Sequence, residues 1–233
     1  MNTGDKRKTV VVSIMPCTAK KNEIVRPEHF TDGEQDVDFV LTTVEVTRMI
    51  REAGIDLTQV PSESLDMPFG LASGAAAIFG VTGGVTEAVL RYVAKSSKLE
   101  DLEQISYMGI RGDDAIKEAT VQLGDRELKI AVVNGLKNAD DLMKKIQSGE
   151  VYYDFVEVMA CPGGCVGGGG QPIKDGFEMA GERAPKLYEL DKRRNIRFSH
   201  ENPEIKKLYE DFLGELLSEK SHELLHVHEA HKV

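Results

Sequence analysis

The chain has 233 residues, of which 41% are hydrophobic, and this is enough to bury the core of one large domain. Its 29 basic and 39 acidic residues give a formal net charge of -10, which argues against a nucleic-acid partner. No apolar run reaches the roughly 20 residues that a membrane-spanning helix needs, and the polar amino terminus is unlike a secretory signal.

The sequence contains three cysteines, an odd and low number. A disulfide framework would need an even and denser set. We therefore expect reduced thiols, either buried or bound to metal, in a reducing compartment such as the cytoplasm.

The first predicted elements are two strands and a helix. Residues 8–15 are rich in β-branched side chains and predict a strand buried on both faces, which Pro16 ends. Residues 37–41 predict a second strand. Thr42 and Glu45 then form a capping-box pattern, which predicts the start of a helix.

Strands and helices continue to alternate in the middle of the chain. A helix is expected from the paired glycines at 83–84 to about residue 94, and residues 128–133 predict a buried strand. Asn138 is expected to cap a helix that ends at Gly149. Residues 154–160 predict a further strand.

Residues 183–233 read as a helical tail, with an amphipathic stretch at 203–217. The alternation of strands and helices predicts an α/β protein with mostly parallel twisted sheets flanked by helices. We find neither an internal repeat nor a linker, so residues 1–233 are expected to form a single domain portion.

Two distant cysteines each follow a predicted strand. Cys17 comes after the strand at 8–15, and Cys161 comes after the strand at 154–160. Sites in open α/β sheets form beyond the carboxyl ends of the strands. If both strands belong to one sheet, the two thiols can converge on one metal site.

Cys161 and Cys165 lie in a glycine-rich segment, Cys-Pro-Gly-Gly-Cys-Val-Gly-Gly-Gly-Gly-Gln-Pro. Glycines let the backbone adopt positive φ and approach a bulky inorganic group, and the exposed amides can donate to sulfur. A flexible linker is the alternative, although linkers combine Gly with Ser and rarely carry cysteines. A phosphate cradle is another, but the Lys-Ser/Thr pair of a P-loop is missing.

The segment around Cys17, Met-Pro-Cys-Thr-Ala-Lys-Lys-Asn-Glu, is weaker evidence by itself. A cysteine after a buried strand is more often a small buried hydrophobe than a ligand. Lys20, taken alone, is more often a solvated surface cation.

Together, the two cysteine segments resemble two of the three cysteine signatures of iron-iron hydrogenases. The resemblance covers nearly the whole chain, which includes further family-like segments at 26–28, 36–38, 74, 78–80, 82–84, 118–120 and 199–203. It implies the iron hydrogenase fold and the carboxy-terminal portion of the family's catalytic domain.

The resemblance also implies a cofactor. The family's active centre, the H-cluster, is a 4Fe-4S cluster joined through one cysteine to a diiron unit with CO, cyanide and a bridging dithiolate amine. By motif, Cys17, Cys161 and Cys165 would be cluster ligands, with Cys165 as the bridge.

Four further residues receive roles from the resemblance. Lys20 would donate a charge-assisted hydrogen bond to a cyanide. Met15 and Met159 would pack against the diiron unit with polarizable sulfur, and Phe79 would line the same pocket. Ordinary core packing is the alternative for the three apolar residues.

The implied reaction is the reversible reduction of two protons to hydrogen, in an anaerobic metabolism. Ferredoxin or a related electron carrier would be the partner. The cofactor would carry this chemistry, and the protein would supply ligation, a dry pocket and hydrogen bonds.

The sequence departs from the family in its ligand count. A 4Fe-4S cluster normally takes four thiolates, and this chain offers three. The family's Cys-Cys-Pro signature, which carries the fourth ligand and a proton-relay cysteine, should lie upstream of the strand at 8–15. The chain is therefore expected to be a fragment, to need a second subunit, or to be a reduced relative that senses hydrogen or binds iron-sulfur without turnover.

The carboxy terminus contains a literal zinc-protease pattern, in which His222 and Glu223 are followed by His226. The motif lies close to the end of the chain, where a cleft-lining helix is hard to build. We expect a docked or solvated tail with incidental metal affinity.

Overall fold

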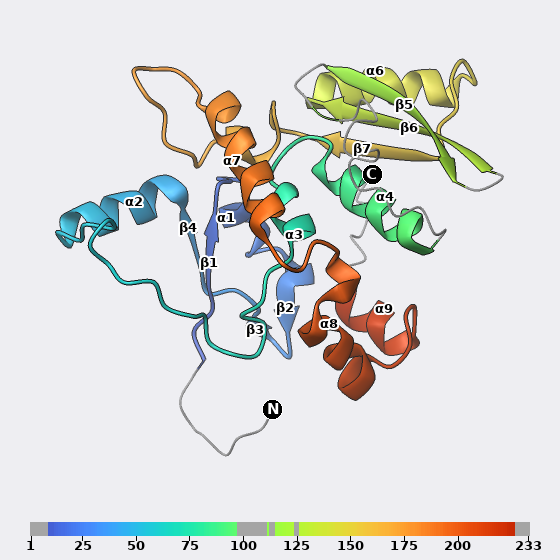
Figure 1. Ribbon diagram of the computed structural model, residues 1–233. Coiled ribbons are helices and arrows are strands. Elements are labelled where there is room, and N and C mark those ends of the chain that lie inside the picture. The colour runs from blue at the N-terminus through green and yellow to red at the C-terminus, as the bar shows by residue number, and fades with distance from the viewer. Residues whose placement is uncertain (1–8, 97–110, 112–114, 124–125, 227–233) are drawn as a thin grey trace.

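The computed structural model describes residues 9–96, 111, 115–123 and 126–226. Three small sheets and a set of helices make up this part of the chain (Figure 1). The mixed α/β architecture with a helical carboxy-terminal part agrees with the fold class expected from the sequence.

The first sheet is a parallel pair of strands, β1 (Val12–Met15) and β4 (Phe39–Thr42). The connection between them contains α1 (Lys20–Glu23) and the 3-10 helix η1 (Pro27–His29). It also contains the short antiparallel hairpin of β2 and β3, whose bounds are Phe30–Thr31 and Glu34–Gln35.

Helix α2 (Thr43–Glu52) follows β4 directly and begins with the predicted capping box. The Thr42 hydroxyl accepts a hydrogen bond from the Glu45 amide at 3.3 Å, and the Glu45 carboxylate accepts one from the Thr42 amide at 2.7 Å. These bonds satisfy amides that the first helical turn leaves free.

The second large unit is a three-stranded sheet in the order β5-β6-β7 (Ile116–Leu123, Arg126–Asn134, Phe155–Met159). Strand β7 pairs parallel to β6. Strand β5, which the sequence analysis did not predict, pairs antiparallel to β6. Cys17 and Cys161 were expected to converge if the strands before them belonged to one sheet. These strands, β1 and β7, lie in different sheets, so this condition is not met.

A helix covers each face of this sheet, as Figure 1 shows. Leu90 and Ala94 of α4 (Gly84–Ser96) pack against Ile130 of β6 on one face. Leu142 of α6 packs against Ala131 and Val133 of β6 on the other. The alternation of β6 side chains between faces explains both cores.

Helix α6 (Leu136–Gln147) differs from the prediction at its start. Its first turn follows Gly135, whose φ of 87° turns the chain after β6, so Asn138 lies within the helix and does not cap it. The Asn138 amide donates instead to the Asn134 carbonyl at 2.5 Å, and the helix ends as predicted at Gly149, whose φ is 75°.

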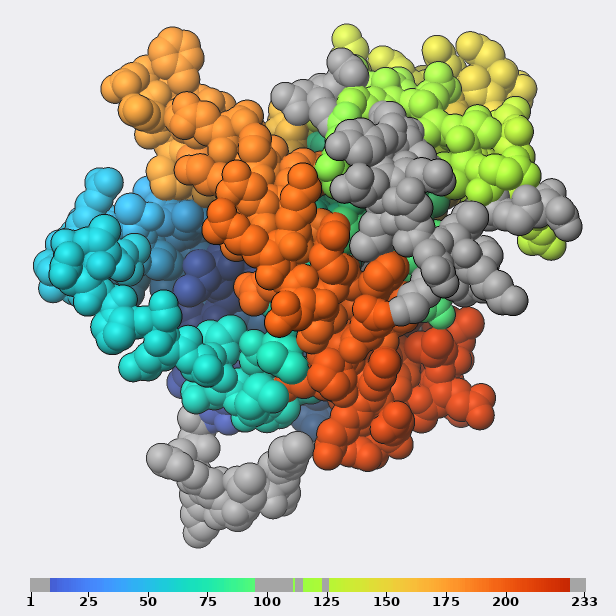
Figure 2. Space-filling model, viewed as in Figure 1, coloured from blue at the N-terminus to red at the C-terminus, as the bar shows by residue number. Residues whose placement is uncertain are grey.

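Helix α7 (Ala180–Arg193) crosses the middle of the molecule and packs on α3 (Gly74–Ile78) (Figure 2). A Cβ at Gly74 would lie 2.1 Å from Asp191 Oδ1, so glycine permits the close approach. The carboxy-terminal part then continues through η3 (Ser199–Glu201), α8 (Pro203–Leu208), the π-helical turn η4 (Tyr209–Leu213) and α9 (Glu219–Leu225).

A buried ion network joins α4 to α7. The Arg91 guanidinium donates to both carboxylate oxygens of Asp191, at 2.8 and 2.7 Å, and also to Glu87. Arg111 pairs with Glu87, and Arg197 pairs with Asp191, each at 2.8 Å. These paired charges fix α7 against the helix that supports the three-stranded sheet.

Candidate metal centre

Cys17 lies just beyond the end of β1 and is half-buried. The residue before it, Pro16, accepts a hydrogen bond from the Gly170 amide at 2.9 Å. A Cβ at Gly168 would come within 2.2 Å of the Pro16 oxygen. The glycine-rich segment after Cys165 therefore lies directly against the Cys17 segment.

Cys161 and Cys165 are held by a tight turn that follows β7. The Gly164 amide donates to the Cys161 carbonyl at 3.0 Å, and the 3-10 helix η2 (Cys165–Gly167) begins at the second cysteine. Gly163 and Gly164 have φ values of 77° and 91°, a region that L side chains rarely adopt. The turn thus needs both glycines between the thiols.

The segment from Gly80 to Thr82 forms a wall behind this turn. The Thr82 amide donates to the Gly163 carbonyl at 3.1 Å, and the Val166 amide donates to the Gly80 carbonyl at 2.9 Å. A Cβ at Gly164 would lie 2.7 Å from the Thr82 nitrogen. The turn is consequently fixed by backbone contacts that exclude side chains.

Asn134, at the end of β6, reaches the same turn. Oriented for its best hydrogen bonds, its amide donates to the Cys161 carbonyl at 3.0 Å and accepts from the Gly163 amide at 3.1 Å. Arg183 of α7 donates to the Val166 carbonyl at 2.9 Å and to the Pro172 carbonyl. The sequence analysis missed both residues, since nothing local marks them.

The three thiols and Lys20 share one electrostatic environment. Burial raises the pKa of the Cys165 thiol, and the nearby Cys161 and Cys17 raise it further, while Lys20 lowers it. Within the described ranges, no three His, Cys, Asp or Glu side chains could hold one metal ion. A cluster, in contrast, binds each thiolate through a different iron.

The donor set fits an iron-sulfur cluster. Three soft sulfur donors lie on the glycine-rich turn and on the Cys17 segment that packs against it, and thiolates are the ligands that iron-sulfur clusters take. The set is one thiolate short of the four that a 4Fe-4S cluster takes.

Lys20 begins α1, five residues after the end of β1 and three residues after Cys17. Its Nζ lies 2.6 and 2.8 Å from the two carboxylate oxygens of Glu23. Glu23 Oε1 in turn lies 3.9 Å from His29 Nε2. The i,i+3 spacing of Lys20 and Glu23 could have indicated this pair from the sequence.

The structure places the other three predicted residues around the site in different ways. Met15 and Met159 are the last residues of β1 and β7, and both are half-buried. Phe79 follows α3 and is 45% exposed. It lines an apolar cavity of about 440 Å³ together with Tyr92 and Phe198, and no cysteine is among the described residues that line this cavity.

A smaller cavity, of about 280 Å³, opens beside Cys165. Pro16 and Gly80 line it from one side, and Arg183 and Lys186 of α7 line it from the other. A cationic helix face therefore adjoins the thiol that is the most exposed of the three.

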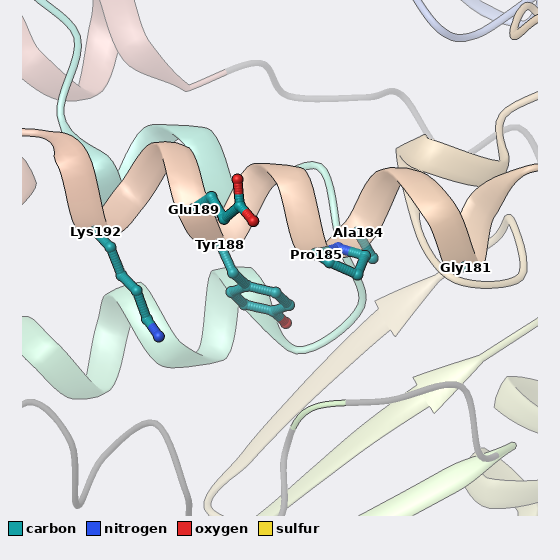
Figure 3. A pocket seen from close by; sticks show the side chains of 6 residues that line it. All are labelled: Gly181, Ala184, Pro185, Tyr188, Glu189 and Lys192. Carbon is teal, nitrogen blue, oxygen red and sulfur yellow. The ribbon is translucent and has the colours of Figure 1, made fainter.

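A cavity of about 420 Å³ lies along α7, with Tyr188 and Lys192 pointing to the same side of the helix (Figure 3). The Arg111 guanidinium stacks 4.0 Å from the centre of the Tyr188 ring. None of the described residues that line this cavity is a cysteine, so we do not assign it to the metal centre.

The zinc-protease pattern lies on and just after α9. The rings of His222 and His226 are 4.6 Å apart between centroids, and Glu223 is their neighbour on the helix. In the part of the chain that the structure describes, these residues are not among any group of three that could bind a metal ion. The more distal histidines, at 228 and 231, lie outside the described residues.

The fold and the sulfur-lined turn define the class of an iron-sulfur protein. Comparison with protein families narrows this class: residues 1–169 match the model of the iron-only hydrogenase large subunit, C-terminal domain. Residues 178–228 match the model of the iron hydrogenase small subunit. The chain belongs to the iron-only hydrogenase family.

Several relatives resemble the chain over most of its length. It is 49% identical over 224 residues to the NADP-reducing hydrogenase subunit HndD of Solidesulfovibrio fructosivorans, covering 96% of this chain and 38% of that protein. It is 41% identical over 227 residues to iron hydrogenase 1 of Clostridium pasteurianum, covering 95% and 40%. It is also 34% identical to the cytosolic iron-sulfur assembly component 3 of Mus musculus, covering 92% and 46%.

Solved structures give the same family. The apo form of a variant FeFe-hydrogenase, HydA1 from Chlamydomonas reinhardtii, matches with a TM-score of 0.71 and 38% identity, covering 94% of this chain and 62% of that one. The chain spans less than half the length of HndD, of iron hydrogenase 1 and of the assembly component described above. No helix in the described part is long and apolar enough to cross a membrane.

Proposed function

We propose that this chain is part of a hydrogenase that reversibly reduces protons to hydrogen at a 4Fe-4S-linked diiron centre. The observation that carries the proposal is the shared site of Cys17, Cys161, Cys165 and Lys20, built from two sheets and one glycine-rich turn. Cluster binding alone would require the thiols but not a cation beside them.

When bound, the H-cluster would supply the hydride and proton chemistry. The chain's residues would bind and orient it: Cys17, Cys161 and Cys165 as thiolate ligands, with Cys165 as the bridge to the diiron unit. Lys20, aligned by Glu23, would donate to a cyanide ligand. Met15, Met159 and Phe79 would keep water from its apolar side.

A further polypeptide would complete the site, either as an upstream segment or as a second subunit. Parallel sheets are normally covered on both faces, yet Val12, Ile14 and Phe39 of the β1–β4 pair are 47, 60 and 59% exposed. Helices of that polypeptide packed on the faces of this pair would cover these side chains. A strand of the same polypeptide paired parallel to β1 would bring its carboxyl end, and with it the fourth thiolate, beside Cys17.

Electrons would come from ferredoxin or a related acidic carrier, and we place the protein in the cytoplasm because three cysteines are too few for a disulfide framework. The chain carries a net charge of -10, which repels an acidic partner in general. Lys186 and Arg183, at the cavity beside Cys165, offer a local cationic face for docking.

A second candidate is an iron-sulfur-binding or hydrogen-sensing role without turnover. It is favoured by the three-thiolate donor set and by the resemblance to proteins named as iron-sulfur assembly components. In the iron-sulfur-binding form of this alternative the chain would bind a cluster but would not hold a diiron unit.

The deciding experiment expresses the chain under anaerobic maturation, alone and together with a family polypeptide that carries the Cys-Cys-Pro signature. We expect iron and sulfide to bind, and infrared bands of CO and cyanide to appear in the complemented sample. Lys20→Met should shift or remove the cyanide bands. Lys21→Met should not, because the Lys21 ammonium pairs with Glu45, at 2.9 Å.

The absence of CO and cyanide bands, with four or fewer irons per complex, would contradict the hydrogenase assignment and support the second candidate. A complemented sample that binds no iron and sulfide would contradict both.

A further inference from the structure

Glu157 is a carboxylate in an unusual position, the middle of β7, four residues before Cys161. It is only 5% exposed, although its strand neighbour Val158 is 47% exposed. Charged side chains are rarely buried without dedicated partners. The partners of Glu157 therefore indicate what its burial accomplishes.

Its carboxylate accepts three hydrogen bonds from two residues at the start of α4. The Gly83 amide donates to Oε1 at 2.7 Å, and the Thr86 amide and hydroxyl donate to Oε2 at 2.7 and 2.6 Å. The amides in the first turn of a helix lack partners within the helix, and their dipoles favour an anion. The carboxylate thus ties β7 to the beginning of α4.

The segment that Glu157 holds is the wall behind the cysteine turn. Thr82, next to Gly83, donates its amide to the Gly163 carbonyl at 3.1 Å, and Gly164 approaches the same residue so closely that a Cβ would lie 2.7 Å away. Glu157 consequently binds the strand that leads into Cys161 to the backbone that supports the turn toward Cys165.

We propose that Glu157 is a positioning residue that sets the placement of Cys161 and Cys165 relative to each other by locking the end of β7 to the start of α4. This rests on the proposed function, because a cluster is what the two thiols would be placed for. Cys17 follows β1 of the other sheet, and the Glu157 carboxylate accepts its hydrogen bonds from Gly83 and Thr86, so the loss of this carboxylate should affect Cys17 less than Cys161 and Cys165.

The test is Glu157→Gln in the full chain without metal, where the alkylation rate of each cysteine by iodoacetamide is followed by peptide mass spectrometry. Glutamine replaces one of the two carboxylate oxygens with an NH2 group that cannot accept a hydrogen bond, so either Gly83 or Thr86 loses the acceptor for its backbone amide. We expect Cys161 and Cys165 to react several-fold faster relative to Cys17, and hydrogen exchange at Gly83 and Thr86 to accelerate.

The matched control is Asp154→Asn. Asp154 precedes the other end of β7, and its carboxylate accepts from the Lys129 amide at 2.8 Å, so the variant removes the same kind of bond away from the turn. Its cysteine reactivity ratio should equal that of the unmodified chain. If Glu157→Gln fails to fold, Thr86→Val keeps the carboxylate and both backbone bonds, and should give a smaller shift in the same direction.

Equal acceleration of all three thiols, an unchanged ratio in the folded variants, or the same shift in Asp154→Asn would each overturn the proposal. Iron uptake after reconstitution with iron and sulfide gives a separate readout, expected to fall in Glu157→Gln. If the unmodified chain in its complemented form takes up no iron, the proposed function fails, while the thiol ratios still decide the role of Glu157.

Discussion

Gly164 illustrates how a single position can restrict the cysteine turn. Its φ is 91°, and an added Cβ would lie 2.7 Å from Thr82 N and 2.8 Å from Val81 C. Conformation and contact thus both require glycine, whereas the sequence pattern indicated only the conformational part. The Asn134 amide and the Glu157 carboxylate act on the same turn from the three-stranded sheet.

Gly164→Ala should therefore lose stability and iron binding together. The strain at this φ and ψ, a region that essentially only glycine adopts, is about 1–3 kcal/mol, and the backbone collision adds to it. Gly181→Ala is the matched control, because a Cβ there meets nothing within 4 Å and the position lies in helix α7. Urea unfolding and iron analysis would check this; equal iron uptake by the two variants would contradict it.

Glu45 predicts a pH dependence at the residue scale. Its hydrogen bond from Lys21 and its bonds from Thr42 lower its pKa from 4.5 to about 2. Because the folded pKa is depressed, this stabilisation is present above pH 4.5 and is lost as the pH falls toward about 2.

Glu45→Gln should therefore lower the thermal midpoint at pH 7, and its difference from the unmodified chain should shrink between pH 4.5 and about 2. A series of unfolding curves over this range tests the prediction. A difference that stays constant with pH would contradict a role for the carboxylate charge.

At the scale of elements, the decisive contact is the ion network between α4 and α7. The Arg91 and Asp191 side chains are each 1% exposed, and Glu87 is fully buried. Buried charges are destabilising when they lose a partner, so the network specifies one relative placement of the two helices. This placement also brings Arg183 and Lys186 to the cavity beside Cys165.

Arg91→Met should destabilise the protein by about 3–5 kcal/mol, because it leaves Glu87 and Asp191 buried with one cation fewer. The exposed pair of Arg48 and Glu52, at 2.7 Å, offers the control, and Arg48→Met should change stability by about 0.5 kcal/mol or less. Chemical unfolding of both variants would measure the contrast, and comparable values would show that the network contributes little.

At the scale of the whole molecule, two family models meet in one chain. The large-subunit model ends at residue 169 and the small-subunit model begins at residue 178. The two parts are joined by the α3–α7 packing, the Arg91–Asp191 pair and the bonds from Arg183 to the cysteine loop. The connection between them includes Phe177, which is 73% exposed.

Splitting the chain at residue 177 and expressing the two pieces together should therefore leave them associated. The buried contacts hold the pieces, and the exposed connection is not needed for packing. Co-purification through a tag on one piece would measure this, and Asp191→Asn should weaken it. Separation of the unmodified pieces at moderate salt would show that the covalent connection holds α7 in place.

Local chemistry made much of the fold predictable from the sequence. The capping box at Thr42 and Glu45, the helix after the paired glycines and the strands before Cys17 and Cys161 depend on near neighbours, and the structure has them within a few residues. The predicted start of α6 at Asn138 was wrong, because the chain turns at Gly135, which has a positive φ, and the helix begins directly after it.

The sequence by itself determined the family, through the spacing of the cysteines and the glycines between Cys161 and Cys165. Only the tertiary structure decided that β1 and β7 belong to separate sheets and that Glu157 and Asn134 support the turn. The physical reason is that motifs record local backbone requirements. Which buried polar groups from distant strands become partners depends on tertiary packing, and the spacing of residues in the sequence does not specify this packing.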